Sequence, residues 1–551
     1  MLPAFDVATV RAAEANLLAC QARPDELMQL AATAVAEVAQ TMLDTPLPSP
    51  AAPVLILAGP GGNGGDGLYA GAQLARAGFP VTAVLCAGSA HAPALDALRA
   101  AGAVVLESAD APLPTPALII DAVAGLGSAR GLDGVAWQYY RNARESGARG
   151  TRVLAVDMPA GVDAHTGHAH SQCVHADVTI TFGYPRTGHL HAPECGRVMV
   201  ADLKLEGASA SFAQELERSG RPAGYLCHEA SLEEAGAEVG AGLRDAGSTG
   251  AIVDPTPGVR SNKYSGGVVG VAAGSQAYPG AGVLAATAAV RATPALVRVI
   301  SHASPAAAII AAVPEVVVHP QLDAAGRMDA LVIGPGRGTD AQAAAELAAA
   351  LQIDSGEIAL VIDADALTLL SQDSALRELL RQRRGVSVLT PHEGEFARLY
   401  RAVCAPRDGA GGKAGSATAG GAGGEAGPES HLESRSRGEL AGTLARELHS
   451  IVLLKGRITT IADPDGGLWA VNTGNSFAAT AGSGDVLAGL LGALLAQGGQ
   501  AAHQCVLSAI AIHAHAAALA AWTPEGYAGA SASRIANALP RATAKLLRSN
   551  R

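Results

Sequence analysis

The chain has 551 residues, of which 49% are hydrophobic, 16% charged and 3% aromatic, and its formal net charge is −11. This length suits two or three domains, and the apolar content is enough to bury a core in each. A general nucleic-acid binder needs basic patches to neutralise phosphates, so the acidic balance argues against nucleic-acid partners. A local nucleotide site is compatible with it, because backbone N–H groups and a few cations suffice.

Cysteine usage and apolar stretches indicate the compartment. The seven cysteines form no CxxC pair and no zinc-type spacing, which predicts free thiols in a reducing cytoplasm. The N-terminus has no basic segment followed by an apolar one, so we predict no signal peptide. The apolar stretch from Cys505 to Trp522 contains Ser508 and two histidines, and we interpret it as a buried helix. We therefore expect a cytoplasmic protein without membrane contact.

Buried strands alternate with helices in the first half of the chain. The apolar runs that predict strands are 54–59, 81–88, 117–125, 152–161 and 176–183. Such runs, separated by Ala- and Leu-rich helices, are typical of a parallel sheet covered on both faces. We expect a Rossmann-like three-layer α/β domain over residues 1–215, followed by a linker at 216–258.

A Gly-rich loop, GPGGNGGDG at 59–67, follows the first of these strands and precedes a helix. Its glycines let the backbone approach a ligand and aim N–H groups at an anion. The next strand ends at Cys86 without the acidic residue that a redox dinucleotide domain uses to hold the ribose. The loop therefore predicts a site for a dinucleotide-like or phosphorylated ligand, with a tight strand–helix turn as the alternative.

Two later strands end in carboxylates. Asp121 ends ALIID, and Asp157 ends RVLAVD. Because the carboxyl ends of strands in an open α/β sheet form the ligand crevice, we expect both to converge with Asp66 of the Gly-rich loop. A single strand-end Asp is often only a helix cap, but three of them beside glycines favour a site.

The motifs GPGGNGGDG, DAVAGLG and DMPAGVD together resemble the NAD(P)H-hydrate epimerase family, over about residues 5–215. The implied substrates are NADHX and NADPHX, in which water has added across the nicotinamide C5–C6 bond, and the implied reaction interconverts their R and S epimers at C6. Asp157 would be the catalytic residue that contacts the reacting ring. A potassium ion would be bound by Asn63, Asp121 and Ala160. The dinucleotide would be held by Gly62, Asn63, Gly64, Gly65, Asp66, Gly125, Leu126, Gly127, Ser128, Ala129, Arg130, Gly131 and Asp157.

Two positions depart from this family's pattern. Gly62 stands where the family usually has Asn, and Ala160 stands where it usually has Ser. The first change removes a side-chain amide from the loop, and the second removes a hydroxyl near the expected ion, where a backbone carbonyl could still coordinate. The departures leave open a first domain that only binds, as a nucleotide sensor or scaffold.

A second α/β domain is expected over residues 259–551. Its predicted strands are 266–274, 329–336, 358–367 and 385–391, followed by a hairpin within 451–471 and helices from about Gly484 onward. Residues 404–437 are rich in Gly, Ala and Ser and lack apolar residues to bury, which predicts a disordered surface insertion. A functional lid is the alternative for that insertion.

The strongest motif of the second half is NTGN at 472–475 followed by ATAGSGD at 479–485 and a helix. Glycines at a helix start expose backbone N–H groups, which form an anion hole for a phosphoryl group in transfer. Asp485 is placed to take a proton from an attacking hydroxyl. The alternative is an ordinary helix start that Ser483 caps, with Asp485 in its first turn.

The strings GPGRG, VIDADAL, LTPHEGEF, LLKGRITTI and TGN…ATAGSGDVLAG occur in consistent order between about 260 and 490. As a set they resemble a ribokinase-type fold and, more narrowly, the ADP-dependent NAD(P)H-hydrate dehydratase family. The resemblance implies that Asp485 is the catalytic base. It implies that the adenine nucleotide, ADP or AMP, is held by Lys455, Gly456, Arg457, Ile458, Thr459 and Gly484. The hydrated nicotinamide would be held by Ala281, Gly336, His392 and Asp485.

The implied chemistry is coherent. Hydroxide leaves poorly from C6, whereas phosphate leaves easily after ADP phosphorylates that hydroxyl, so the products would be NAD(P)H, AMP and phosphate. Magnesium would assist the nucleotide, and a homo-oligomer is expected. A kinase of a small molecule, such as a vitamin precursor, is the alternative because the same fold and anion hole serve kinases. The sequence does not decide between NADHX and NADPHX, or between ADP and ATP.

Overall fold

The computed structural model divides the chain into two compact units, Met1–Ser248 and Thr249–Arg551. It describes residues 1–43, 53–106, 115–127, 130–145, 150–228, 243–245, 252–293, 295–353, 357–404 and 435–549. Both units are α/β, with strands and helices alternating along the chain, so the expected fold class is confirmed.

The first unit is built on a largely parallel sheet with the strand order β10-β8-β7-β6-β5-β2-β3-β4. Its strands are β2 (Val54–Ala58), β3 (Val81–Leu85), β4 (Val104–Leu106), β5 (Leu118–Ala122), β6 (Arg152–Val156), β7 (Val178–Phe182), β8 (Arg197–Ala201) and the antiparallel β10 (Leu243–Asp245). Strands β1 (Leu2–Ala4) and β9 (Gly224–His228) pair in antiparallel and are not part of this eight-stranded sheet. The chain leaves β2 toward β3 on one side and returns to β5 on the other. This reversal makes the edge beyond β2 and β5 a switch point, where ligands of open α/β sheets bind.

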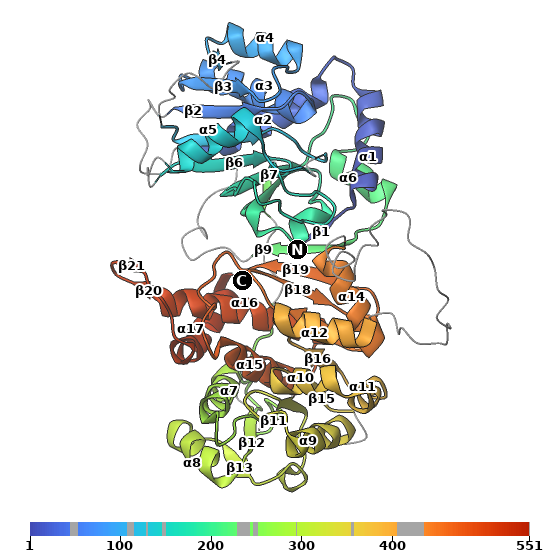
Figure 1. Ribbon diagram of the computed structural model, residues 1–551, viewed down its shortest axis with the longest axis vertical. Helices are drawn as coiled ribbons and strands as arrows, with labels where there is room; N and C mark the ends of the chain where they lie inside the picture. Colours follow the sequence, from blue (N-terminus) through green and yellow to red (C-terminus); the bar gives the residue numbers. More distant parts are fainter. Residues whose placement is uncertain are drawn as a thin grey trace, which may run out of the picture. The chain divides into compact units, whose positions relative to one another are not determined.

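Helices cover both faces of this sheet (Figure 1). They are α1 (Val7–Cys20), α2 (Glu26–Leu43), α3 (Gly62–Arg76), α4 (Ala92–Ala100), α5 (Gly134–Glu145) and α6 (Phe212–Ser219), with short 3-10 turns at Thr187–Leu190 and Pro193–Cys195. Successive side chains of β2 point to opposite faces of the sheet, as in any pleated strand. Ile56 contacts the glycines of α3, whereas Leu55 and Leu57 join the cluster that Tyr139 of α5 closes on the other face.

The second unit contains the sheet order β19-β18-β17-β16-β15-β14-β11-β12-β13. The strands are β11 (Val268–Ala272), β12 (Leu296–Ile300), β13 (Val317–His319), β14 (Ala330–Ile333), β15 (Ala359–Ile362), β16 (Ser387–Leu389), β17 (Ile451–Leu454), β18 (Ile458–Ala462) and β19 (Leu468–Asn472). Those from β13 to β17 pair in parallel, and β17, β18 and β19 form an antiparallel meander. The switch point of this sheet lies between β11 and β14.

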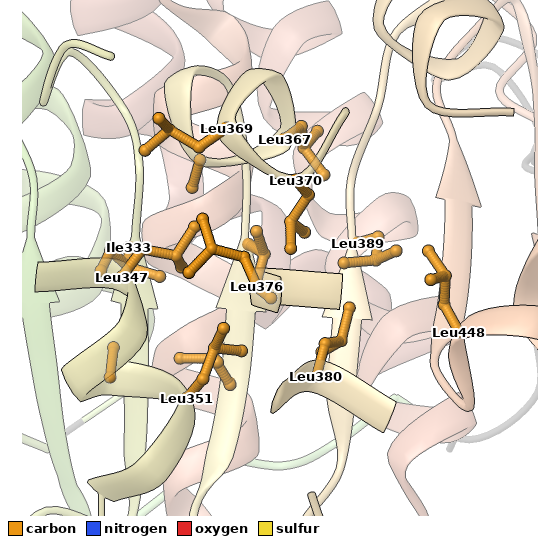
Figure 2. Packing of buried hydrophobic residues seen from close by; sticks show 14 of the residues in the cluster. Ile333, Leu347, Leu351, Leu367, Leu369, Leu370, Leu376, Leu380, Leu389 and Leu448 are labelled. Carbon is orange, nitrogen blue, oxygen red and sulfur yellow. The ribbon is translucent and has the colours of Figure 1, made fainter. Parts of the chain in front are cut away.

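Two layers of helices enclose this sheet. The helices are α7 (Pro279–Ala292), α8 (Ala303–Ala312), α9 (Ala341–Gln352), α10 (Asp365–Gln372), α11 (Ser374–Arg381), α12 (Glu393–Cys404), α14 (Arg437–Leu448), α15 (Ser483–Gln497), α16 (Ala502–Ala521) and α17 (Ala532–Ser549), with a 3-10 turn at Asp323–Ala325 and a small β20–β21 pair at Trp522–Thr523 and Gly526–Tyr527. Figure 2 shows leucines of α9, α10, α11 and α14 packed against Ile333 and Leu389 of the strands. On the opposite face α15 packs on β11, β14 and β15.

The helix Ala502–Ala521 is long and apolar enough to cross a membrane, but 83% of its apolar window is buried inside the protein. It packs against α15 and α17, which agrees with the interpretation of this stretch as a buried helix.

Several boundaries differ from the sequence-based expectation. The predicted strands are present but shorter, and the expected hairpin is a three-stranded meander. The expected linker at 216–258 begins inside α6, and β9 also belongs to the first unit. The predicted insertion at 404–437 extends too far at both ends. Cys404 is the last residue of α12, and Ser436 is the N-cap of α14, where its side chain accepts a hydrogen bond from Glu439 N. The remaining residues of the insertion, 405–434, lie outside the described part of the chain.

Candidate active sites

A cavity of about 510 Å³ lies at the carboxyl ends of the parallel strands of the second unit. Asp363 directly follows β15, His392 follows β16 and Lys455 follows β17. Strand ends therefore supply one wall, as is usual in open α/β sheets. The first turn of α15 and the loop before it supply another, and the lining residues include Thr473, Asn475, Ala479, Thr480, Gly482, Ser483, Gly484, Asp485 and His513.

The start of α15 exposes backbone N–H groups to this cavity. Gly482 precedes the helix with φ 82°, a left-handed conformation that favours glycine. Ser483 is the first helical residue and Gly482 takes the cap position without a side-chain acceptor, so Ser483 does not cap the helix, whereas Asp485 does lie in its first turn. First-turn N–H groups without a side-chain cap are available to an anion, and the helix dipole favours negative charge there.

An ion pair lies beside this helix start. Lys455 Nζ is 2.9 Å from Asp363 Oδ1, and Asp363 is almost completely buried. A Cβ added to Gly484 would lie 3.3 Å from Lys455 Nζ and 3.6 Å from Asp363 Oδ2, so the glycine leaves the ion pair open to the helix N-terminus. Burial disfavours the charged form of Lys455, but nearby carboxylates, Asp363 foremost, outweigh it and raise its pKa.

Asp485 is electrostatically coupled to this pair. Burial raises the pKa of Asp485 to about 6, the negative charge of Asp363 adds to this, and Lys455 opposes it. A carboxyl group with a pKa near 6 is ionised at neutral pH and is more basic than an ordinary aspartate. The position and the pKa of Asp485 both suit a general base.

His392, which directly precedes α12, and Glu395 of its first turn also line the cavity. The backbone N–H of His392 donates to Glu395 Oε2 at 2.9 Å, and its Nε2 lies 3.5 Å from Glu395 Oε1. Arg437, the first residue of α14, pairs with Glu393 and donates to the carbonyl oxygen of Lys455 at 2.7 Å. Arg437 therefore ties α12 and α14 to the loop that carries Lys455.

The other residues expected to hold substrate lie at the switch point. A Cβ on Gly336 would meet Ala281 Cβ at 2.8 Å, so these two residues are neighbours, although neither lines the cavity. The segment that follows β14 is continuous with the cavity wall, since Gly334 approaches the backbone of Asp363 and Gly338 N donates to Asp365. Ile458 is buried in β18 and does not line the cavity either.

Two cavity residues escaped sequence reasoning. Asp363 was available as the first aspartate of VIDADAL directly after a strand, but its partner Lys455 lies 92 residues away. Buried His513 of α16 donates through Nε2 to the carbonyl oxygen of Ser483 at 3.0 Å. Burial lowers the pKa of His513 to about 4, so this imidazole is neutral. No pattern in the sequence pointed to it.

The site of the first unit begins at the Gly-rich segment after β2, in which residues 62–67 already belong to the start of α3. A Cβ on Gly59 would lie 1.9 Å from the carbonyl oxygen of Val123, and one on Gly64 would lie 1.9 Å from that of Gly59. These glycines are required because backbones touch. Gly61 and Gly62, by contrast, have no atom within 4 Å of an added Cβ, so this end of the turn is open.

The carboxylates of the first unit converge only in part. Asn63 Nδ2 donates to the carbonyl oxygen of Val156 at 3.0 Å, and a Cβ on Gly125 would meet both Asp157 Oδ2, at 2.8 Å, and Asn63 Oδ1, at 3.2 Å. Burial raises the pKa of Asp66 well above its usual range, and the charge of Asp157 contributes. The expected segment 125–131 thus faces Asp157 through Gly125, whereas Ser128 and Ala129 lie outside the described residues.

Asp121 lies deeper than the other acids. It is fully buried in β5, where Oδ2 accepts from Ala160 N at 2.7 Å and Oδ1 from Val123 N at 3.3 Å. Burial raises the pKa of Asp121 to about 6, against the lowering effect of these backbone donors. No lysine or arginine of the described chain pairs with this carboxyl group, so a cation nearby would compensate its burial.

Comparison with known proteins gives a consistent result for both units. Residues 24–188 match the family model of the YjeF-related protein N-terminus, and residues 269–541 match that of NAD(P)H-hydrate dehydratase. The bifunctional NAD(P)H-hydrate repair enzyme Nnr of Corynebacterium glutamicum is 38% identical over 99% of this chain and 99% of its own. The chain belongs to this family of bifunctional NAD(P)H-hydrate repair enzymes.

Two further relatives match one half each of this repair enzyme. An NAD(P)H-hydrate epimerase of Microbacterium testaceum is 43% identical over 210 residues, covering 37% of this chain and 79% of its own. Among solved structures, an ADP/ATP-dependent NAD(P)H-hydrate dehydratase of Bacillus subtilis co-crystallised with ATP and Mg²⁺ is 27% identical, covers 53% of this chain and 94% of its own, and has a TM-score of 0.42. Family membership decides against the kinase and the inactive scaffold as alternatives.

Proposed function

We propose that the cavity of the second unit performs the dehydration of this repair enzyme with Asp485 as the base. The observation that carries the proposal is the placement of Asp485 in the first turn of α15, next to the ion pair of Lys455 with Asp363. Asp485 would take the proton of the C6 hydroxyl as that oxygen attacks the terminal phosphorus of ADP. The phosphate then leaves C6 and the C5 proton is lost, giving NAD(P)H, AMP and phosphate.

Cations and N–H groups would hold the nucleotide. Lys455 and the N-terminus of α15 face the same cavity and would stabilise the charge that builds up on the transferring group. Gly456, Arg457 and Thr459 line it as well and would contact the nucleotide. Magnesium would neutralise phosphate charge during this step, and Asp363 offers the oxygen ligand that such a hard cation prefers.

The hydrated nicotinamide would lie along the sheet edge. His392 and Asp485 belong to the cavity, while Ala281 and Gly336 mark the neighbouring switch point. A dinucleotide is long enough to bridge both regions, so substrate recognition at the switch point and reaction at Asp485 are compatible.

In the first unit, Asp157 would take the proton of the C6 hydroxyl as the C6–N1 bond opens to an aldehyde, and return it when N1 re-forms the bond from the other face of that carbonyl group, while residues 62–66 and 125–131 hold the dinucleotide. Asn63, Asp121 and the carbonyl oxygen of Ala160 would hold potassium. This donor set consists of oxygens, which suit a hard cation, and the buried carboxyl group of Asp121 lacks a cationic side chain among the described residues. All seven cysteines are free thiols, which is compatible with a cytoplasmic location. The cytoplasmic location and the homo-oligomer both stay predictions.

Absorbance at 340 nm tests the dehydratase, because only dehydrated nicotinamide absorbs there. Purified (S)-NADHX is mixed with the whole protein and ADP, then in parallel with ATP, and AMP or ADP formation is followed chromatographically. We expect one NADH per nucleotide cleaved. NADH formation without nucleotide cleavage would refute the phosphoryl-transfer step. If Asp485 is the base, Asp485→Asn should lose this activity.

A further inference from the structure

A short segment that starts within β7 and continues past its end contacts Asp157 of the first unit. It runs from Thr181 to His189 and includes Arg186, and we call it the clamp segment. Three of its side chains contact Asp157, although 24 to 32 residues separate them from it in sequence. None of them stands out as a motif in the sequence.

The carboxylate of Asp157 is held through one of its two oxygens. Oδ1 lies 2.8 Å from Arg186 Nη2 and accepts from Thr181 Oγ1 at 2.9 Å. Asp157 and Arg186 are 6% and 2% exposed. Arg186 Nη1 donates to the carbonyl oxygens of Phe182, at 2.8 Å, and Tyr184, at 2.6 Å, so the guanidinium group is itself fixed. These hydrogen bonds offset part of the desolvation of the buried ion pair, while Arg186 Nε is buried without a hydrogen-bond partner among the described residues.

The backbone of Asp157 is held as well. Its φ of 65° lies in the left-handed region, which costs a non-glycine residue about 1–2 kcal/mol. Asp157 N donates to the carbonyl oxygen of Ile180 at 2.8 Å, and the carbonyl oxygen of Asp157 accepts from His189 Nε2 at 2.8 Å. Because His189 Nδ1 accepts from Arg186 N at 2.8 Å, the ring proton must be on Nε2. Burial lowers the pKa of His189 to about 4, which keeps the ring neutral.

The second carboxylate oxygen of Asp157, Oδ2, points toward Gly125. A Cβ on Gly125 would lie 2.8 Å from Oδ2, so this oxygen faces the segment proposed to hold the dinucleotide. Asn63, a proposed ligand of potassium, approaches the same point through its Oδ1. The clamp segment therefore uses Oδ1 and the backbone of Asp157 and leaves Oδ2 directed at the expected substrate.

We propose that Arg186, with Thr181 and His189, is a positioning residue for epimerisation that fixes Asp157 Oδ2 toward the C6 hydroxyl. This inference rests on the proposed role of Asp157. Without the guanidinium group, Oδ1 loses its charged partner, so the carboxylate rotates away from Gly125 or turns toward water. Either change removes the correctly placed base from the catalytic step and leaves the dinucleotide contacts intact.

The test uses the whole protein carrying Arg186→Met, Arg186→Lys or Thr181→Val. The matched control is Arg218→Met, which removes an exposed arginine of the same unit whose Nη1 lies 3.6 Å from Glu215. Appearance of (S)-NADHX from (R)-NADHX in the absence of ADP, followed chromatographically, gives kcat and KM of epimerisation. Dehydration of (S)-NADHX by the same variants shows whether the second unit is intact. Thermal unfolding shows whether the first unit is still folded.

We expect Arg186→Met to lower kcat for the R epimer by about 10²-fold or more, as loss of correctly placed acid–base catalysis does. KM should change less than about threefold, Arg186→Lys should recover part of kcat, and Arg218→Met should match the wild type. Thr181→Val, which keeps the ion pair and nearly the same volume, should lower kcat severalfold without a large fall in melting temperature; it remains decisive if Arg186→Met unfolds.

Three outcomes would overturn the inference: a wild-type kcat in Arg186→Met or in Thr181→Val, or a loss that lies entirely in KM. The failure of the underlying proposal is distinguishable. If Asp157→Asn still epimerises, Asp157 is not the base and the proposed function of the first site is wrong. If Asp157→Asn is inactive while Arg186→Met is fully active, only the positioning role is wrong.

Discussion

The pH dependence of dehydration follows from the surroundings of Asp485. Burial and the charge of Asp363 raise the pKa of Asp485 to about 6. The base acts only when ionised, so activity is full above this pKa and is lost as the pH falls through it. Lowering the pH from 7 to 5 therefore protonates Asp485. Asp121 of the first unit, whose pKa burial also raises to about 6, titrates in the same range but lies outside the dehydratase cavity.

The size of the effect can be worked out. With a pKa of about 6, the ionised fraction of Asp485 is roughly 0.9 at pH 7 and roughly 0.1 at pH 5, a fall of about tenfold. An aspartate with the ordinary pKa of about 3.9 would still be more than about 90% ionised at pH 5. Replacing Asp363 by Asn removes a negative charge, so the midpoint of this acid limb should move to lower pH.

The assay measures kcat/KM for (S)-NADHX at saturating ADP, by absorbance at 340 nm, with a blank without enzyme at each pH. NADHX is preferred to NADPHX because it lacks the 2′-phosphate, which titrates in the same range. Saturating nucleotide limits the contribution from ionisation of free ADP. Asp485→Asn should have about 10²–10⁴-fold lower activity and no acid limb near pH 6. A flat wild-type profile between pH 7 and pH 5, or an unchanged profile in Asp485→Asn, would refute the reasoning.

Three further predictions follow from burial and close contacts. Gly59→Ala should lower the free energy of unfolding of the first unit, measured by chemical denaturation, by at least about 1–3 kcal/mol because its Cβ would overlap the carbonyl oxygen of Val123. Gly61→Ala should change this free energy by less than about 1 kcal/mol because the space around its added Cβ is open. His189 and His513 have pKa values of about 4 when folded and ordinary values near 6.5 when unfolded, so each lowers the free energy of unfolding as the pH drops from about 6.5 to 4, whereas Asp121 and Asp485, with folded pKa values of about 6, act in the opposite direction. The free energy of unfolding of the wild type minus that of His513→Gln isolates one histidine and should decrease over that range; a difference that does not depend on pH would contradict the burial of His513 as a neutral ring. Asp157→Ala should consume only the S epimer and leave the R epimer, as chromatography of the residual substrate would show, apart from slow spontaneous conversion.

The sequence predicted the parts of the fold that local pattern determines. Continuous apolar runs such as 54–59 and 152–161 indicated strands because parallel strands are buried on both faces. Short strands escaped notice where polar residues interrupt the run, as in β12 with Arg298 and β13 with His319. The extent of the first unit was also missed, because β9 is defined by its pairing with β1 at the other end of that unit.

Motifs located the candidate sites, but their partners came only from the structure. The helix start at Asp485 and the strand end at Asp157 carry visible Gly-rich or Asp-containing patterns. Asp363 raises the pKa of Asp485, and Arg186 forms an ion pair with Asp157. Tertiary packing brings each of these partners to its aspartate. A single sequence does not encode such distant pairs in its spacing. Prediction from motifs therefore finds reacting groups more readily than the residues that orient them.

One measurement tests the central claim that a single chain repairs both epimers. An equal mixture of (R)- and (S)-NADHX is incubated with the whole protein, ADP, magnesium and potassium, and both epimers are followed chromatographically together with absorbance at 340 nm. The account predicts that both disappear, that NADH accumulates to the sum of the two, and that Asp157→Ala stops at the S half. Persistence of the R epimer with the unmutated protein would contradict an active first site, and persistence of both would contradict the assignment of the dehydratase as well.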